Sequence, residues 1–291
     1  MNAVVAKKAD LSDHPCFAES AENRHGRLHL PTSAACNIQC RFCQRSCNTD
    51  EERPGVSQGI VSPDEAVSIV ARALELSPNI AVVGIAGPGD TLASPYALEA
   101  FRRVNEVYPE LIKCMSTNGL ALPGRARDLY DAGVRALTVT VNAVKPEITA
   151  QIVSQIVYQG KIYTGETAGA ILISNQLAGI REAVAQGITV KVNSVLIPGV
   201  NDEHVAEIAK AVAEAGAERH NIIPLIPQYE FADTPAPTCE QTEKARAEAG
   251  KYINQFLHCA HCRADACGVP GESDFSEQLY SGKVLETFSH G

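Results

Sequence analysis

The sequence contains no tryptophan, and aromatic residues make up only 5% of it. Basic residues are also few: 25 Lys and Arg stand against 34 Asp and Glu, which gives a formal net charge of −9 at pH 7. A surface that binds nucleic acid needs clustered positive charge and often aromatic side chains that stack on bases. The composition therefore excludes nucleic acid as the main partner.

Long apolar runs are missing as well. No stretch reaches the ~18 apolar residues of a membrane span, and no apolar run follows Lys7 and Lys8 as it does in an export signal. We therefore expect a cytoplasmic protein without a membrane segment. Ten cysteines in such a chain indicate metal ligation, because the cytosol keeps thiols reduced and disfavours a disulfide framework.

Short apolar runs alternate with helical patterns between residues 28 and 230. Gly133, Gly187 and Gly216 each end a predicted helix directly before an apolar strand, which is typical of a parallel βα array. About six βα units fit in this range, so the sequence predicts an α/β fold with a partial (βα)6 parallel barrel, and a doubly wound sheet is the alternative. In either architecture the active site lies at the C-terminal ends of the strands.

The pattern divides the chain into three segments. They are an N-terminal loop segment at 1–27, the partial barrel at 28–230 and a C-terminal extension at 231–291. Within the barrel we expect a first strand at about 27–32, a helix that begins at the capping signal Ser62–Glu65, and helices within 146–186. The core of the extension would be too small to stand alone.

Cys36, Cys40 and Cys43 form a C-x3-C-x2-C motif just after the first predicted strand. Three thiolates can hold three irons of a [4Fe–4S] cluster and leave the fourth iron open to a small molecule. A zinc knuckle or structural cluster is the alternative, although zinc sites usually pair C-x2-C units at a longer separation. The spacing, with Phe42 before the last cysteine, resembles the signature of radical S-adenosylmethionine (SAM) enzymes, in which SAM chelates the open iron.

Cys259 and Cys262 form a second motif, C-x2-C, in the extension. Two thiolates at this spacing can bind one metal centre only with ligands from elsewhere, and a lone C-x2-C is also typical of zinc or redox sites. We therefore expect the extension to fold back over the barrel mouth, and to become open to protease when its metal is removed.

Several further motifs accompany the cysteines. They are His14-Pro15-Cys16-Phe17, Gly26-Arg27-Leu28-His29, Arg53-Pro54-Gly55, Gly87-Pro88-Gly89-Asp90 and Ser116-Thr117-Asn118-Gly119. Together with both cysteine motifs, they resemble the NifB family of radical SAM proteins over most of residues 14–272. The resemblance implies three [4Fe–4S] clusters: one that binds SAM, on Cys36, Cys40 and Cys43; a second on His29, Cys47 and Cys114; and a third on Cys16, Cys259 and Cys262.

Some of these assignments have alternatives. His14 and His25 are rivals to His29, and a single cysteine on a strand, such as Cys114, is also typical of a core position. Cys47 stands closer to the preceding cysteine than we expect in the family. Two further cysteines, Cys239 and Cys267, are given no ligand role.

The resemblance also implies an activity. In this family two [4Fe–4S] clusters are fused with a SAM-derived carbide and one more sulfur, giving the [8Fe–9S–C] precursor of the nitrogenase cofactor used in nitrogen fixation. The partners expected with it are an iron–sulfur cluster donor, a low-potential electron donor such as ferredoxin or flavodoxin, and a downstream cofactor carrier or scaffold. The alternatives are a radical SAM enzyme with auxiliary clusters that acts on an organic or peptide substrate, and an iron–sulfur scaffold or carrier without SAM chemistry.

Polar and small residues near the strand ends are candidates for binding SAM and for moving protons. The turn at Gly87 lets the backbone approach the methionine end of SAM because glycine has no Cβ. Candidates for the ribose and adenine are Asn118, Thr140 and Asn193, although Thr140 also fits an ordinary strand position. Glu51 or Glu52 is a candidate proton relay, but a solvated acidic turn is the commoner case for such residues.

Overall fold

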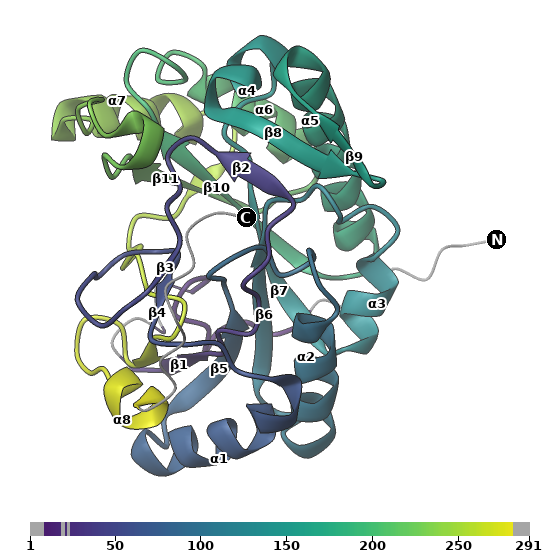
Figure 1. Cartoon of the computed structure of the whole chain (residues 1–291), viewed down its shortest axis with the longest axis vertical. Coiled ribbons are helices and arrows are strands. Elements are labelled where there is room, and N and C mark those ends of the chain that lie inside the picture. Colours follow the sequence, from purple (N-terminus) through teal and green to yellow (C-terminus); the bar gives the residue numbers. More distant parts are fainter. Residues whose placement is uncertain (1–8, 19–20, 22–23, 282–291) are drawn as a thin grey trace.

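The computed structural model describes residues 9–18, 21 and 24–281 (Figure 1). Its central element is an eight-stranded sheet with the order β12-β11-β10-β7-β6-β5-β1-β13. The parallel strands are β1 (Gly26–His29), β5 (Ile80–Ile85), β6 (Ile112–Thr117), β7 (Val134–Thr140), β10 (Thr189–Leu196) and β11 (Arg219–Pro224). These strands confirm the predicted partial (βα)6 barrel.

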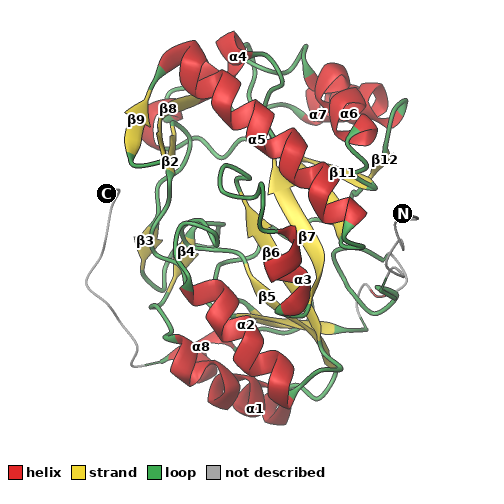
Figure 2. Ribbon diagram, turned by 90° about the vertical axis from the view of Figure 1, so that its right-hand side faces the viewer, coloured by secondary structure: helices red, strands yellow, loops and turns green. Residues whose placement is uncertain are grey.

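The helices form an outer arc around the strands (Figures 1 and 2). They are α1 (Ala66–Leu76), α2 (Tyr96–Val107), α3 (Ala126–Asp131), α4 (Pro146–Ile152), α5 (Gly165–Ala185), α6 (Val205–Glu214), α7 (Cys239–Gly250) and α8 (Ser276–Tyr280), with 3-10 turns η2 (Pro63–Glu65) and η3 (Tyr229–Phe231). The main core contains the buried Phe101 of α2, Leu129 of α3 and Ile180 of α5. None of the helices in the described ranges has the length and apolar character of a membrane span.

Local sequence signals explain how the helices begin and end. The backbone N–H of Ser62 donates to the Glu65 carboxylate (3.0 Å), which completes the predicted capping box ahead of α1. The glycines before β7, β10 and β11 have φ values of 89°, 90° and 98°. Only glycine adopts this left-handed conformation without strain, so each helix stops there and the chain turns into the next strand.

A β-hairpin stands where the sequence predicted only helices within 146–186. Its strands are β8 (Val153–Tyr158) and β9 (Lys161–Tyr163), and the turn residues Gln159 and Gly160 both have positive φ, 50° and 74°. A Gln-Gly pair between two strand-forming runs was the available signal. β8 also pairs with β2 (Ile38–Cys40), so the hairpin holds the cysteine loop as one strand of a three-stranded sheet.

The extension shares the main sheet with the barrel. Its strand β12 (Asn254–Gln255) pairs with β11, and β13 (Cys267–Gly268) pairs antiparallel with β1. A separate two-stranded sheet joins β3 (Ser46–Cys47) and β4 (Val56–Ser57). The predicted boundary at 230/231 therefore separates sequence patterns rather than sheets. Residues 1–8, 19, 20, 22 and 23 of the predicted N-terminal segment lie outside the described residues.

Candidate active site

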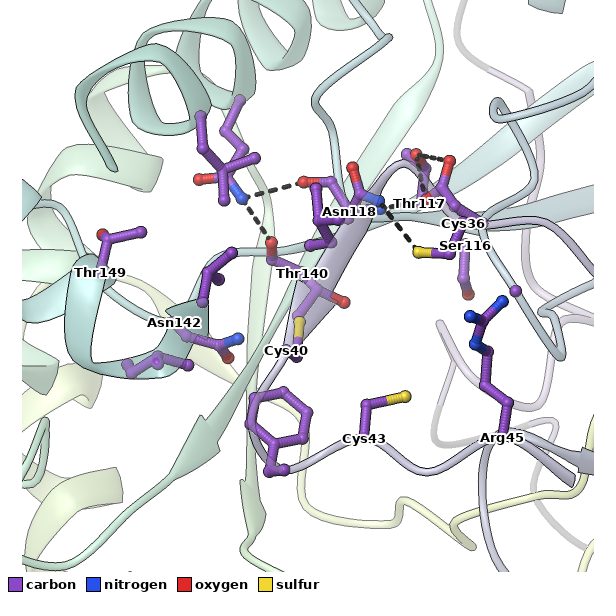
Figure 3. A pocket seen from close by; sticks show the side chains of 18 of the residues that line it. Cys36, Cys40, Cys43, Arg45, Ser116, Thr117, Asn118, Thr140, Asn142 and Thr149 are labelled. Carbon is purple, nitrogen blue, oxygen red and sulfur yellow. Dashed lines mark hydrogen bonds between the residues drawn. The ribbon is translucent and has the colours of Figure 1, made fainter. Parts of the chain in front are cut away.

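A small cavity of about 180 Å³ lies beside the cysteine loop (Figure 3). Its lining contains all three cysteines of the first motif, Cys36, Cys40 and Cys43. The other side chains labelled in Figure 3 are Arg45, Ser116, Thr117, Asn118, Thr140, Asn142 and Thr149. The first motif and two predicted SAM-binding residues, Asn118 and Thr140, therefore share one cavity.

The glycine turn before Asp90 is bound to the loop that leads into the cysteines. The backbone N–H of Gly89 donates to Ser33 O (2.6 Å), and that of Asp90 donates to Ala35 O (2.8 Å). A Cβ on Gly89 would overlap the carbonyl oxygen of Ala35, so only glycine fits. Glycine at position 89 thus allows the backbone at Ala35 to lie close to this turn. Gly87, the residue we predicted to face SAM, is not in the lining of this cavity.

The buried carboxylate of Asp90 organises the neighbouring strand end. It accepts hydrogen bonds from Thr117 Oγ1 (3.0 Å) and from the backbone N–H of Asn118 (2.6 Å). Burial nevertheless raises the pKa of Asp90. Asn118 in turn donates from Nδ2 to Asn37 Oδ1 (2.7 Å), and the same nitrogen lies 3.8 Å from the sulfur of Cys36. Asp90 and Asn118 therefore fix the cysteine loop as well as line the cavity.

Gln176, which is buried on α5, is a site residue that the sequence did not predict. Its Nε2 donates to the carbonyl oxygens of Asn118 (2.9 Å) and Thr140 (2.8 Å), so one side chain ties together the ends of β6 and β7. The available signal was a polar residue on the buried face of a helix, four positions after Leu172 and four before Ile180.

The three thiols of the small cavity are chemically suited to a cluster. Burial, and then the carboxylate of Asp90, raises the pKa of Cys36 to about 12, and burial raises the pKa of Cys40 and Cys43. Thiolate ligation must therefore displace protons, and metal binding supplies the compensation. No three His, Cys, Asp or Glu side chains of the described residues could hold a single metal ion. A [4Fe–4S] cluster has a different requirement, since each thiolate binds its own iron.

A large cavity of about 480 Å³ adjoins the small one. The two linings have in common Phe42, Cys43, Ala86, Pro88, Ser116 and Thr140. The large cavity brings together candidate ligands from distant parts of the chain, namely Cys16, His29, Cys114, Cys259 and Cys262. Asn193, predicted to contact SAM, lines this cavity and not the small one.

Cys47 is the predicted ligand that the structure does not bring to either cavity. It lies on β3 and is 3% exposed. Burial raises its pKa, and its thiol shares a hydrogen bond with the side chain of Ser57. The short pairing of β3 with β4 accounts for this placement, because it brings the thiol of Cys47 to the side chain of Ser57.

Hydrogen bonding distinguishes the three candidate histidines. His29 Nδ1 lies 3.0 Å from the carbonyl oxygen of Arg263, which can only accept, so Nδ1 carries the proton and Nε2 keeps the lone pair that binds metals. Burial, followed by the charge of Arg27, lowers the pKa of His29 to about 4. His14 also lines the large cavity, but its Nδ1 accepts from the backbone N–H of Cys16 (3.1 Å). His25 lies away from the cavity, 3.4 Å from Asp13. Of these three, only His29 both lines the large cavity and keeps a lone pair on Nε2.

The structure does not place either predicted proton relay at a cavity. Glu51 pairs with Arg53 (2.8 Å) and accepts hydrogen bonds from Ser46 and Asn48. Burial acts to raise the pKa of Glu51, but the hydrogen bonds outweigh it and lower the pKa. Neither Glu51 nor Glu52 is in the lining of either cavity. These contacts give Glu51 a structural role in the loop after the cysteines.

Comparison with known proteins places this chain among described families. A family model for the radical SAM superfamily matches residues 30–212. The FeMo cofactor biosynthesis protein NifB of Methanocaldococcus infernus is 46% identical, over 95% of this chain and 92% of that protein. The protein of the same name from Methanocaldococcus jannaschii is 43% identical, over 95% of this chain and 95% of that protein. The one from Klebsiella pneumoniae is 42% identical, over 96% of this chain and 61% of that protein.

Solved structures support the fold alone. A radical SAM methyltransferase from Sphaerobacter thermophilus has a TM-score of 0.57 at 18% identity, over 84% of this chain and 69% of that one. SuiB from Streptococcus suis has a TM-score of 0.55 at 10% identity, over 88% of this chain and 51% of that one. Both likenesses agree with the partial barrel described above.

Proposed function

This chain belongs to the NifB family of the radical SAM superfamily, and on that premise we propose that it builds the [8Fe–9S–C] precursor of the nitrogenase cofactor. In the proposed reaction two [4Fe–4S] substrate clusters are fused, with a SAM-derived carbide and one further sulfur. Membership of the family makes the chain a radical SAM enzyme of FeMo cofactor biosynthesis that uses a [4Fe–4S] cluster and SAM.

The observation that carries the proposal is the shared wall between the two cavities. The small cavity holds the C-x3-C-x2-C thiols, and the large cavity holds the remaining candidate ligands apart from Cys47. Cys43 and Thr140 line both. The shared wall would let a group produced from SAM at the first site pass to a substrate cluster in the second over a short distance.

We assign the resident cluster to Cys36, Cys40 and Cys43. When bound, that cluster supplies the electron that splits SAM. Among the polar side chains that line the same cavity, those of Asn118, Thr140, Asn142 and Gln176 are our candidates to hold SAM. Asn118 already binds the side chain of Asn37 and the backbone N–H of Leu120, and Gln176 binds the backbone carbonyls of Asn118 and Thr140, so both side chains are fixed before SAM arrives.

We assign the substrate clusters to the large cavity. His29 and Cys114 would hold one, and Cys16, Cys259 and Cys262 would hold the other. The electrostatic interaction of Cys16 with Cys259 and Cys262 supports their grouping in one set, because such an interaction requires proximity, and Cys114 of the other set also lies close to Cys16. A ligand role for Cys47 would require the β3–β4 pair to rearrange. The cluster donor, the ferredoxin or flavodoxin reductant and the cofactor carrier remain expected partners.

Anaerobic turnover with SAM labelled in its methyl carbon tests the proposal. We expect release of 5′-deoxyadenosine, and we expect the label in the carbide of the cluster product. Cys40→Ala should abolish both, because the resident cluster loses an anchoring thiolate. Cys114→Ala should lower the iron content and the labelled product while 5′-deoxyadenosine still forms. Cys239→Ala, at an exposed cysteine outside both cavities, is the matched control.

Two results would favour the alternatives. Release of 5′-deoxyadenosine without label in any cluster product would indicate a radical SAM enzyme that acts on an organic or peptide substrate. Absence of 5′-deoxyadenosine from the fully reconstituted protein would indicate an iron–sulfur scaffold or carrier.

A further inference from the structure

Among the residues that the structure describes, the lining of the large cavity contains basic side chains but no acidic ones, although the chain as a whole is acidic. Of the described residues that line it, none is Asp or Glu, although the chain has a net charge of −9. Two basic side chains, Arg27 and Lys191, are in the lining. Both are almost completely buried, at 6% and 4% exposure. A buried cation without a carboxylate partner is costly, so the pair indicates an anionic occupant.

Lys191 extends from β10 into this region. Its Nζ lies 3.3 Å from the carbonyl oxygen of Cys16, and 5.1 Å and 4.7 Å from the ring centroids of Phe17 and Phe256. One long hydrogen bond to a neutral carbonyl and two ring contacts offset only part of the cost of burying the ammonium group. The ammonium group of Lys191 therefore lies close to Cys16, a candidate cluster ligand, and it can still donate further hydrogen bonds.

Arg27 approaches the same ligands from β1. It donates from one terminal nitrogen to Gly268 O (2.6 Å), and the other lies 3.3 Å from the sulfur of Cys262. Its Nε is buried and has no hydrogen-bond partner among the residues that the structure describes, and the same is true of Nε2 of His14. Because His14 Nδ1 accepts a hydrogen bond, the orphaned Nε2 carries the proton of the neutral ring. The two side chains that carry these unpaired donors both line the large cavity.

An iron–sulfur cluster ligated by thiolates is an anion of the kind that this lining fits. We propose that Lys191 and Arg27 are positioning residues that balance the negative charge of the substrate clusters, and so raise both their affinity and their reduction potential. This inference rests on the proposed function for the identity of the occupant. Positive charge beside a cluster favours its reduced form, because reduction adds negative charge.

The test uses a background in which Cys36, Cys40 and Cys43 are all Ala, so that reconstituted iron reports only on the large cavity. In this background we compare Lys191→Met, which removes the charge, with Lys191→Arg, which keeps it. Lys113→Met is the matched control, since Lys113 is also buried on a barrel strand, donates to Tyr108 O and lies outside both cavities. The measurements are iron per chain and a redox titration followed by electron paramagnetic resonance.

For Lys191→Met we expect less iron and, at a fixed potential, an about tenfold lower ratio of reduced to oxidised cluster. That change corresponds to a shift of about 59 mV to lower potential for a one-electron couple. Lys191→Arg and Lys113→Met should keep the iron content and the reduction potential of the background protein. If Lys191→Met does not fold, Arg27→Gln against Arg27→Lys makes the same comparison.

Three outcomes would overturn the proposal; the first two reject only the charge assignment, and the third also rejects the site. Iron uptake with equal potentials in Lys191→Met and Lys113→Met would reject the charge assignment alone. So would Lys191→Arg behaving like Lys191→Met, because that result points to a packing role. A background protein that takes up no iron would reject the substrate-cluster site, and this inference with it.

Discussion

His29 Nδ1 lies 3.0 Å from the carbonyl oxygen of Arg263, 234 residues later in the chain. The backbone of His29 is held by the same part of the molecule, because its N–H donates to Ala266 O (2.8 Å) and its carbonyl accepts from the Tyr280 hydroxyl (2.5 Å). The extension therefore sets the orientation of a candidate ligand on the first barrel strand.

A substitution at Gly84 tests whether this orientation matters. A Cβ at Gly84 would lie 2.8 Å from His29 Cδ2. The hydrogen bond of the His29 ring to Arg263 O opposes the movement that would relieve this clash. We expect Gly84→Ala to destabilise the protein by about 1–3 kcal/mol and to lower the iron bound in the large cavity. Gly250→Ala is the control, because its Cβ would meet only Gln255 Cγ, at 3.7 Å. Equal iron content in the two variants would contradict the ligand role of His29.

The buried ion pair between Arg263 and Asp265 predicts a large stability effect. Asp265 is 0% exposed, accepts from Arg263 Nε (2.9 Å) and from the backbone N–H of Gln58 (2.6 Å). Asp265→Ala would leave Arg263 buried without its partner, and we expect the free energy of unfolding in urea to fall by about 3–5 kcal/mol.

The matched control is the exposed pair of Arg127 with Asp131, whose side chains are 73% and 52% exposed. Asp131→Ala should change the free energy of unfolding by less than about 1 kcal/mol. Similar losses in the two variants would show that Arg263 finds another partner or reaches water.

His220 predicts a pH dependence of stability. It is completely buried, and burial lowers its pKa to about 4. Ser194 donates to Val141 O and so accepts from His220 Nε2 (2.9 Å), which leaves Nδ1 as the buried site that a proton would occupy. The unfolded chain binds this proton near pH 6.5 and the folded chain only near pH 4, so stability is lost as the pH falls between these values.

We expect this histidine to cost about 2 kcal/mol of unfolding free energy between pH 7 and pH 5. The measurement is urea denaturation of the metal-free protein at several pH values, compared with His220→Asn. The variant should lose less stability on acidification than the wild type. Parallel pH profiles would mean that His220 does not contribute to the acid sensitivity.

Docking of the extension predicts protease resistance without metal. Arg263 donates to Asn48 O (2.7 Å) and to Glu51 O (2.5 Å), and Ala264 N–H donates to Val56 O (2.8 Å). These contacts need no cluster, so we expect the Cys259→Ala, Cys262→Ala double variant to resist limited proteolysis as the wild type does. A new cleavage site between about 228 and 258 would instead support the sequence-based expectation that the metal centre stabilises the docked extension and that its removal releases this segment.

Local signals predicted the barrel well. The glycines before strands and the capping residues Ser62 and Glu65 determine the backbone conformation only of neighbouring residues. The structure confirms the elements that they predicted. The β8–β9 hairpin was missed because its short apolar runs also fit a helix, and its pairing partner β2 lies over a hundred residues earlier.

The site shows the same division between local and distant information. The two cysteine motifs are local and visible, whereas the contacts of Gln176, Lys191 and Arg263 join segments far apart in the chain. Nothing in the sequence around Cys47 indicates that its thiol packs against Ser57 and away from the cavity. Such packing depends on the assembled sheet, so it could be seen only in the structure.

The extension also protects the margins of the sheet. β12 and β13 cover the outer edges of β11 and β1, and each is only two residues long. Very short edge strands offer little unpaired backbone to another molecule, whereas the strands beneath them would offer more. A chain shortened to end before Asn254 would expose both longer edges, and we expect it to associate edge to edge and precipitate even where its barrel is correctly folded.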